Sequence, residues 1–190
     1  MIRSLALLWL ILDRRHGVSN ANRLGEREFM SADDTSGSEW DRATRELYAR
    51  LIEAWDKRNA RDFALLFASD GNVVGFDGSQ VNGQLEIGAH LTEIFSHHQT
   101  PRYISIVRDV RLIATDVTLL RANTGLVPTG KDDIEPTLNA VQSMIAVKKG
   151  GAWKVALFQN TPATLNMRPD LAKQLTEELR ARLKEKPIPK

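Results

Sequence analysis

The chain has 190 residues, of which 42% are hydrophobic and 26% charged, values typical of a single globular domain that buries a core. It contains no cysteine, which excludes disulfide bonds, thiolate metal sites and a cysteine nucleophile. The formal net charge is +2, but residues 30–167 carry 14 basic and 17 acidic side chains. This central part lacks the basic face that a nucleic-acid-binding protein needs, so we expect no nucleic-acid partner.

The first twelve residues are mostly apolar, a stretch that resembles the core of a signal peptide but is too short to span a bilayer. Asp13, Arg14 and Arg15 follow where a cleavage site would need small residues. One interpretation is export by a signal peptide. The other, which we favour, is a disordered leader over residues 1–37 or an over-extended start before Met30, with a cytoplasmic protein and no stable membrane insertion.

Three helices are expected in the first half of the chain. Residues 38–59 carry apolar side chains at three- and four-residue spacing, which predicts an amphipathic helix with Ser38 as its N-cap. A short second helix around Phe63 is expected to end at Gly71. Residues 84–98 return to helical spacing until Pro101, which bars continuation of the helix.

A turn and four long segments predict the strands. Asp77 and Gly78 form a hairpin-turn signal between short strands at residues 72–76 and 79–81. The long segments are rich in β-branched residues and cover residues 103–114, 117–127, 138–149 and 153–160. Residues 169–184 have a leucine at every fourth position, which predicts a peripheral helix.

This order of elements predicts an α+β fold in which three N-terminal helices pack on a strongly curved sheet of about six strands. The sheet is mixed or antiparallel, since regular alternation of strands and helices is absent. We expect a leader at residues 1–37, the folded domain at residues 38–167, and a C-terminal helix with a basic tail at residues 168–190.

Short motifs in a fixed order resemble SgcJ/EcaC-type, SnoaL-like proteins of the nuclear transport factor two-like superfamily. The motifs span residues 39–166 and are found at residues 55–56, 59–62, 67–70, 75–78, 83–87, 153–155 and 158–161. Pro162 stands where an arginine is commoner, so no role for that position is carried over. The resemblance implies a cone-shaped roll, usually dimeric, with a pocket at its open end.

The activities that the resemblance implies are diverse: ketosteroid isomerisation, polyketide cyclisation or dehydration, and pure association. The sequence has no dinucleotide fingerprint, P-loop or nucleophile elbow, and His97 and His98 lack a third ligand at metal spacing. We therefore expect no cofactor and no metal. Two functions stay open: a cofactor-free isomerase, cyclase or dehydratase of a hydrophobic carbonyl-bearing metabolite, and a ligand-binding or dimeric association module without turnover.

Arg108 is the most informative candidate for ligand binding. A regular strand would place its guanidinium among Ile104, Ile106, Val110 and Leu112, where an unpaired charge is costly. Arg108 would then anchor an anionic or carbonyl-bearing ligand. The alternative is a β-bulge that turns Arg108 outward.

Asp56 and His90 are the catalytic candidates. Asp56 ends the first helix, where partial burial would raise its pKa toward that of a general base; a solvated surface carboxylate is the alternative. His90 lies between the apolar and polar faces of the third helix. It could carry protons into a cavity, or it could be a structural histidine.

The remaining candidates for ligand binding interrupt or flank apolar strand faces. Polar amides on such faces need partners, either across the sheet or on a ligand. The predicted ligand-binding residues, besides Arg108, are Trp55, Phe76, Gln142, Met144, Phe158, Gln159 and Asn160. Asn160 could instead bond the backbone where the last strand ends.

The last strand is apolar on both faces, with Trp153, Val155 and Leu157 alternating with Ala156 and Phe158. Large exposed apolar patches are unusual in monomers, so the second face needs a cover. We therefore expect a homodimer through the outer sheet face, with a small hydrophobic or anionic molecule in the pocket.

Overall fold

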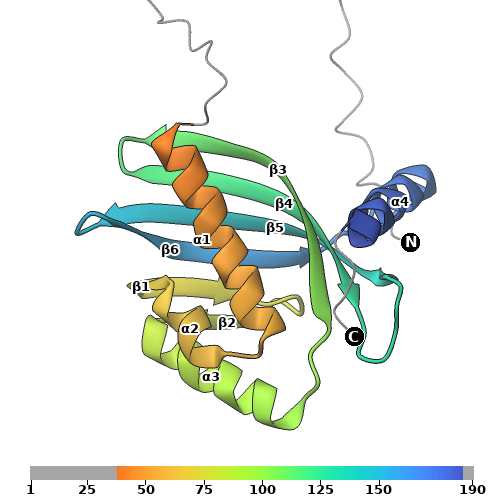
Figure 1. Cartoon of the computed structure of the whole chain (residues 1–190), viewed down its shortest axis with the longest axis horizontal. Coiled ribbons are helices and arrows are strands. Elements are labelled where there is room, and N and C mark those ends of the chain that lie inside the picture. The colour runs from red at the N-terminus through yellow and green to blue at the C-terminus, as the bar shows by residue number, and fades with distance from the viewer. Residues whose placement is uncertain (1–37, 186–190) are drawn as a thin grey trace, which may run out of the picture. The chain divides into compact units, whose positions relative to one another are not determined.

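The computed structural model describes residues 38–185, which form three helices, six strands and a final helix (Figure 1). The predicted leader at residues 1–37 and residues 186–190 lie outside the described residues. In chain order the elements are α1 (Glu39–Asp56), α2 (Ala60–Leu65), β1 (Phe67–Val74), β2 (Gln80–Asn82), α3 (Gln84–His97), β3 (Arg102–Ala114), β4 (Val117–Val127), β5 (Glu135–Lys149), β6 (Ala152–Pro162) and α4 (Pro169–Glu185).

The predicted α+β class, the mixed six-stranded sheet and the C-terminal helix are confirmed. The strand order is β2-β1-β6-β5-β4-β3, and all neighbours are antiparallel except β1 and β6. β3 and β2 are thus the two edges of the sheet. Among the described residues, no helix is long and apolar enough to cross a membrane.

The second helix is shorter than predicted. The Asn59 side chain caps α2 by accepting a hydrogen bond from the Asp62 N–H, at 3.0 Å. The helix ends at Leu65, well before Gly71, because Phe67 already pairs with Val155 of β6 in parallel. Strand pairing across the sheet therefore overrides the local helical spacing.

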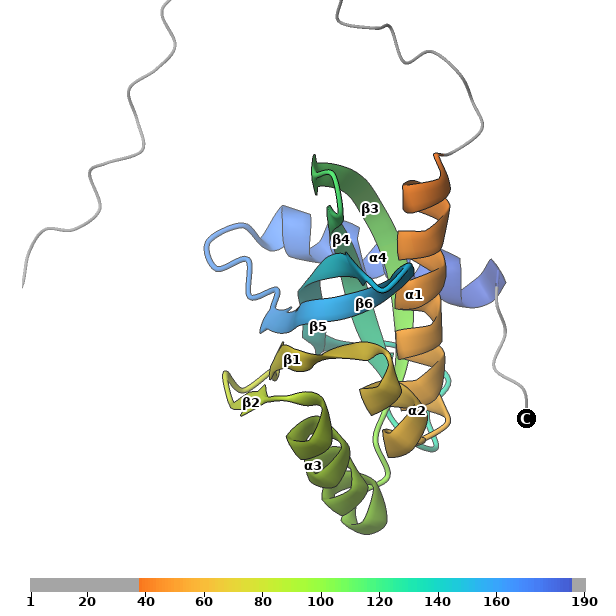
Figure 2. The same cartoon turned by 90° about the vertical axis from the view of Figure 1, so that its left-hand side faces the viewer.

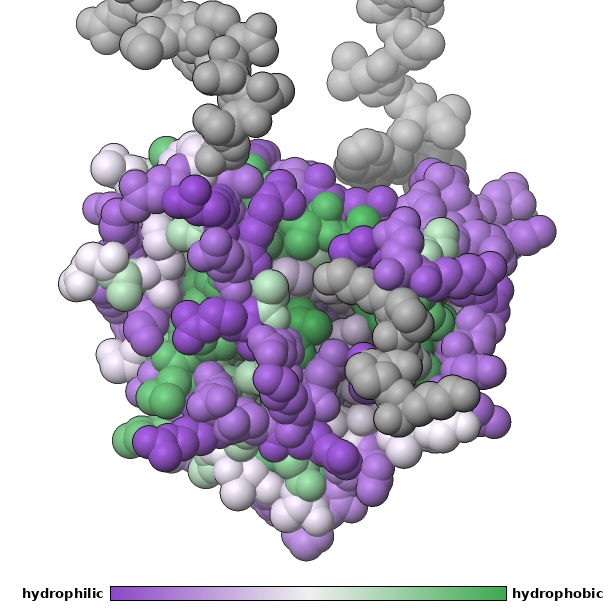
Figure 3. Space-filling view, viewed as in Figure 1, coloured by the Kyte–Doolittle hydropathy of each residue, from purple (hydrophilic) through white to green (hydrophobic). Residues whose placement is uncertain are grey.

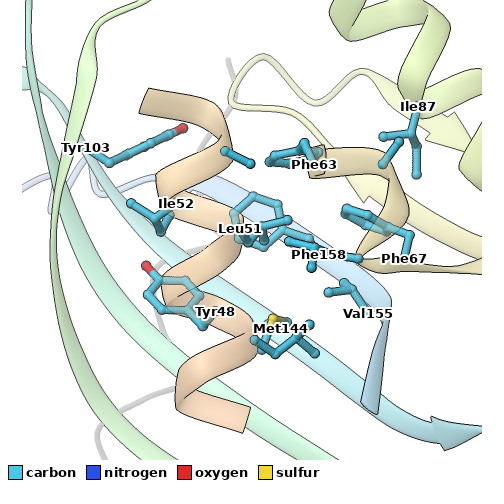
Figure 4. Packing of buried hydrophobic residues seen from close by; sticks show 14 of the residues in the cluster. Tyr48, Leu51, Ile52, Phe63, Phe67, Ile87, Tyr103, Met144, Val155 and Phe158 are labelled. Carbon is cyan, nitrogen blue, oxygen red and sulfur yellow. The ribbon is translucent and has the colours of Figure 1, made fainter. Parts of the chain in front are cut away.

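The main core lies between α1 and the inner face of the sheet (Figure 4). Apolar residues at three- and four-residue spacing on α1, such as Tyr48, Leu51 and Ile52, are buried against the sheet. Met144 of β5 and Val155 of β6 lie beneath them and are fully buried. Ser38 occupies the N-cap position of α1, but its side chain makes no capping hydrogen bond.

A second, smaller core lies on the opposite face of the sheet, under α4. Leu175, Leu179 and Leu183 of α4 pack with Ile104 of β3 and Val127 of β4. The spacing by four residues that predicted this helix is therefore the spacing of its buried face.

Two bulges change which strand residues face inward. The register of β3 against β4 shifts between Val107 and Asp109, which leaves Arg108 as the extra residue. The register of β5 against β6 shifts in the same way between Ile145 and Ala146, which leaves Ala156 of β6 as the extra residue. The regular alternation assumed for both strands is therefore wrong beyond these points.

Candidate functional site

An apolar cavity of about 310 Å³ lies within the fold, between the helices and the inner face of the sheet. Its walls come from the end of α1, from α2 and α3, from the β1–β2 hairpin and from β3 to β6. This volume is at the lower end of the range for small-molecule sites. Its lining residues are Ile52, Trp55, Phe63, Val73, Val74, Gly75, Phe76, Val81, Ile87, His90, Leu91, Thr100, Pro101, Tyr103, Leu126, Leu138, Phe158 and Asn160.

The end of α1 fixes the wall formed by the segment before β3. Trp55 Nε1 donates to the backbone oxygen of Pro101 at 2.9 Å, and the Tyr103 N–H donates to Asp56 Oδ1 at 3.0 Å. The Trp55 ring also packs against Phe95 and Tyr103, with 5.4 Å between centroids in each pair. The aromatic wall is thus held by hydrogen bonds and by ring packing.

A chain of buried hydrogen bonds runs along the inner face of the sheet to the cavity. The Tyr48 hydroxyl donates to Gln142 Oε1 at 2.6 Å, and Gln142 Nε2 donates to Asn160 Oδ1 at 3.2 Å. Asn160 Nδ2 then donates to the Tyr103 hydroxyl oxygen at 3.0 Å. Because the Tyr103 oxygen accepts this bond, its own proton remains available to another acceptor.

Both tyrosines stay protonated at neutral pH, since burial raises the pKa of Tyr48 and of Tyr103 far above the ordinary phenol value. Figure 4 shows Tyr103 reaching inward from β3, with its hydroxyl towards the side on which Phe63 lies. Thr100 adds a second hydroxyl to the lining, and its oxygen is buried without a partner among the described residues. The cavity therefore combines apolar walls with two adaptable hydroxyl groups.

Five of the predicted site residues line this cavity: Trp55, Phe76, His90, Phe158 and Asn160. His90 lies on α3 and is exposed, so it belongs to the cavity mouth. Asn160 does not bond the backbone at the strand end; its amide joins Gln142 to Tyr103 instead.

The other five predicted site residues lie outside the cavity lining. Gln142 is fully buried, but its amide is satisfied by Tyr48 and Asn160, and Met144 belongs to the main core. Gln159 lies beyond the bulge at Ala156, and its amide donates to Thr161 Oγ1 at 3.1 Å.

Arg108 lies on the outer face of β3, on the side of Ile104 and Ile106, and not in the cavity. Its guanidinium donates to Asn123 Oδ1 at 2.5 Å and forms an ion pair with Glu178 of α4. The hydrogen bond from Arg108 to Glu178 lowers the pKa of the Glu178 carboxyl. Regular alternation does place Arg108 on the face of Ile104 and Ile106, but this face packs under α4 and not on the cavity. The bulge instead moves Val110 to the inner face, so the predicted grouping of Arg108 with Val110 was wrong.

Asp56 lines a second groove, to which Tyr103 also contributes. It is partly buried, and this burial raises the pKa of its carboxyl despite the hydrogen bond from the Tyr103 N–H and the charge of Arg102. Asp56 and His90 thus line different depressions, and the structure does not bring them together as a catalytic pair. Within residues 38–185, no group of three His, Asp or Glu side chains is placed to hold a metal ion.

Sequence reasoning missed Tyr103, Thr100 and most of the apolar lining. The alternation of Tyr103, Ser105 and Val107 along β3 could have identified Tyr103, because these residues share the inner face up to the bulge. Thr100 lies in an irregular segment, where spacing carries no such signal.

Comparison with known proteins identifies the fold. No protein-family model matches the sequence, and no curated protein matches it. Among solved structures, a domain of unknown function with a cystatin-like fold from Nostoc punctiforme PCC 73102 is similar, with a TM-score of 0.64 and 20% sequence identity. The match covers 78% of this chain and 99% of that chain.

Two further similar structures have more specific names. A ketosteroid isomerase-like protein from Erwinia carotovora atroseptica SCRI1043 matches with a TM-score of 0.54 and 13% identity, over 67% of this chain and 98% of that chain. A putative calcium/calmodulin-dependent protein kinase type II association domain from Thiobacillus denitrificans ATCC 25259 matches with a TM-score of 0.57 and 13% identity, over 63% of this chain and 94% of that chain. The chain therefore has the cystatin-like fold shared by nuclear transport factor two-like and ketosteroid isomerase-like proteins.

Proposed function

We propose that the domain binds a small, uncharged, mostly apolar molecule that carries one acceptor oxygen, as a pocket protein of the SgcJ/EcaC, SnoaL-like type. The observation that carries this proposal is the direction of the hydrogen-bond chain that ends at Tyr103. Asn160 donates to the Tyr103 oxygen, so the free hydroxyl proton favours a ligand carbonyl or ether oxygen. The Thr100 hydroxyl, which has no partner in the described part of the chain, supports the same assignment.

The charge of the lining favours a neutral ligand over an anionic one. Neither Lys nor Arg occurs among the described residues that line the cavity, and Arg108 is paired with Glu178 outside it. An anion in an apolar cavity without a cationic partner would have to lose its hydration uncompensated. We therefore set aside the anionic ligand that the sequence left open.

Binding without turnover agrees better with the lining than proton transfer does. Among residues 38–185, neither Asp nor Glu lines the cavity, which leaves His90 at the mouth as the candidate proton carrier. A cofactor-free isomerase, cyclase or dehydratase is the second candidate, and the position of His90 is the observation that favours it. His90→Gln would abolish such turnover, while ligand binding would remain.

A pair of matched ligands tests the binding proposal. We expect wild-type protein to bind α-tetralone about fivefold more tightly than its parent hydrocarbon tetralin, because one net hydrogen bond contributes about 1 kcal/mol. Tyr103→Phe should remove this preference and leave the affinity for tetralin within about twofold, as measured by calorimetric titration. An unchanged preference in Tyr103→Phe would reject Tyr103 as the donor. Absence of binding for both ligands, together with no retained molecule in native mass spectrometry, would reject the pocket.

We also propose that the domain forms a homodimer through the outer face of β5 and β6. Val141 is 40% exposed on this face, and Ile145 and Leu157 are only partly buried beside it. Within residues 38–185, α4 packs over β3, β4 and the start of β5, where Asn139 bonds Thr176; the outer face of β5 and β6 beside Val141 stays open to a second copy. An apolar strip of this kind is typical of interface cores.

A further inference from the structure

A large groove runs along the free edge of β3, separate from the apolar cavity. It has a volume of about 1170 Å³, and its walls are α1 on one side and the C-terminal half of α4 on the other. Figure 2 shows α4 running across the fold so that its C-terminal end lies on the side of α1. Figure 3, in the view of Figure 1, shows hydrophobic residues in a hollow beside α1. The groove is therefore an open channel with a strand edge at its floor.

The edge of β3 offers backbone groups to a further strand. The Tyr103 N–H bonds Asp56, so the backbone of Tyr103 points away from β4. Alternation along the strand gives the N–H and C=O groups of Ser105 and Val107 the same direction. Neither N–H has a partner outside the sheet among residues 38–185. An edge of this kind is a template for strand addition.

We infer that this edge is the docking site for residues 186–190 of the same chain, with the sequence Lys-Pro-Ile-Pro-Lys. These residues follow Glu185 directly, and Glu185 lines the groove. Five residues in extended conformation reach roughly 17 Å, and the stretch of β3 from residue 103 to residue 107 is roughly 13 Å long. The segment thus starts at the groove and has the length to cover its floor.

The alternating prolines suit the segment to a sheet edge. Pro187 and Pro189 have no N–H, whereas Lys186, Ile188 and Lys190 do. In a strand, these three N–H groups point to one side and the prolines to the other. Such a strand pairs on one side only and presents no new edge for aggregation.

The charges of the groove agree with this occupant. Its carboxylates Glu53, Glu178 and Glu185 form ion pairs with basic residues, but Asp56 has no such pair within the described part of the chain. Lys186 and Lys190 bring two positive charges to the groove. A lysine of the docked segment would offer a positive charge to the unpaired carboxylate of Asp56.

Hydrogen exchange of single amides, followed by NMR, tests the inference. We expect the Ser105 and Val107 amides to exchange about tenfold or more slowly in the full chain than in a chain ended after Glu185. Ile188→Pro removes the central donor of the segment and should exchange like the shortened chain. Pro187→Ala, whose new N–H points to solvent, should exchange like the full chain.

Two outcomes overturn the inference. Equal exchange in the full and shortened chains means that residues 186–190 do not cover the edge. Slow exchange that survives the shortening and increases with protein concentration assigns the edge to a second copy of the chain instead.

Discussion

The backbone N–H of Tyr103 donates a hydrogen bond to Oδ1 of Asp56, with 3.0 Å between the two atoms. This bond joins the end of α1 to the start of β3, next to the bond from Trp55 to the Pro101 oxygen. Tyr103 lines both the apolar cavity and the groove at the β3 edge. Asp56, a candidate general base in the sequence, therefore has a structural role. Its carboxylate holds the backbone of Tyr103, whose side chain lines the cavity.

Removal of this carboxylate should weaken the fold. We expect Asp56→Ala to lower the free energy of unfolding by about 1 kcal/mol, because the Tyr103 N–H loses its acceptor. Asp56→Asn keeps an acceptor oxygen and serves as the matched control, with a smaller change. Urea unfolding at pH 7 measures both variants. An equal loss in the two variants would show that charge, and not the hydrogen bond, is what matters.

The difference in stability between wild type and Asp56→Asn should depend on pH. Burial raises the pKa of Asp56 above its ordinary value of 3.8, so the folded protein binds this proton more tightly than the unfolded chain. The associated stability is fully present below the ordinary pKa and is lost as the pH rises through the folded pKa. The free energy of unfolding of wild type minus that of Asp56→Asn should therefore fall as the pH rises from 3.8. A difference that stays constant, or that increases with pH, would contradict the raised pKa.

The buried amide chain predicts a large difference in stability loss between substitution of a buried glutamine and substitution of an exposed one. Gln142 is 0% exposed and bonds Tyr48 and Asn160, so Gln142→Leu leaves buried polar groups without partners. We expect a loss of about 2–4 kcal/mol in the free energy of unfolding. Gln174→Leu, on the exposed side of α4, should change it by less than about 0.5 kcal/mol. Similar losses in both variants would mean that the chain contributes little stability.

Most of the fold could be predicted from periodicity, because burial imposes it. The apolar spacing of α1 and α3 and the β-branched strands gave the element order, and leucines at every fourth position predicted α4. The Leu65 end of α2 could not be predicted, since it depends on the pairing of Phe67 with distant Val155.

The site was harder to predict because inward and outward positions depend on two bulges. Arg108 and Ala156 are the extra residues, and nothing in the local sequence marks either position. Each bulge reverses the faces of the residues that follow it, so Gln159 lies outside the cavity while Phe158 lines it. The hydroxyl of Tyr103 acquires its direction from Asn160, which is 57 positions away in the chain.

The proposed dimer contact on the outer face of β5 and β6 predicts which substitution separates the two copies. We expect Ile145→Lys to place a charge in the proposed contact and to convert the dimer to a monomer in sedimentation velocity at micromolar concentration. Leu85→Lys is the matched control, because Leu85 is an 85% exposed residue of α3, away from that face. Monomeric wild-type protein, or a dimer that persists in Ile145→Lys, would assign the contact elsewhere.

α4 should behave as part of the fold, because its buried leucines form a core with β3 and β4. Leu179 is 0% exposed, whereas Leu171 on the same helix is 36% exposed. We expect Leu179→Ala to lower the free energy of unfolding by about 2–4 kcal/mol, since it removes packed methyl groups and leaves a cavity. Leu171→Ala should cost less than about 1 kcal/mol. Chemical unfolding followed by circular dichroism measures both. If Leu179→Ala instead unfolds α4 alone, at lower denaturant concentration than the sheet, then α4 is a separate cooperative unit that the domain can lose without unfolding.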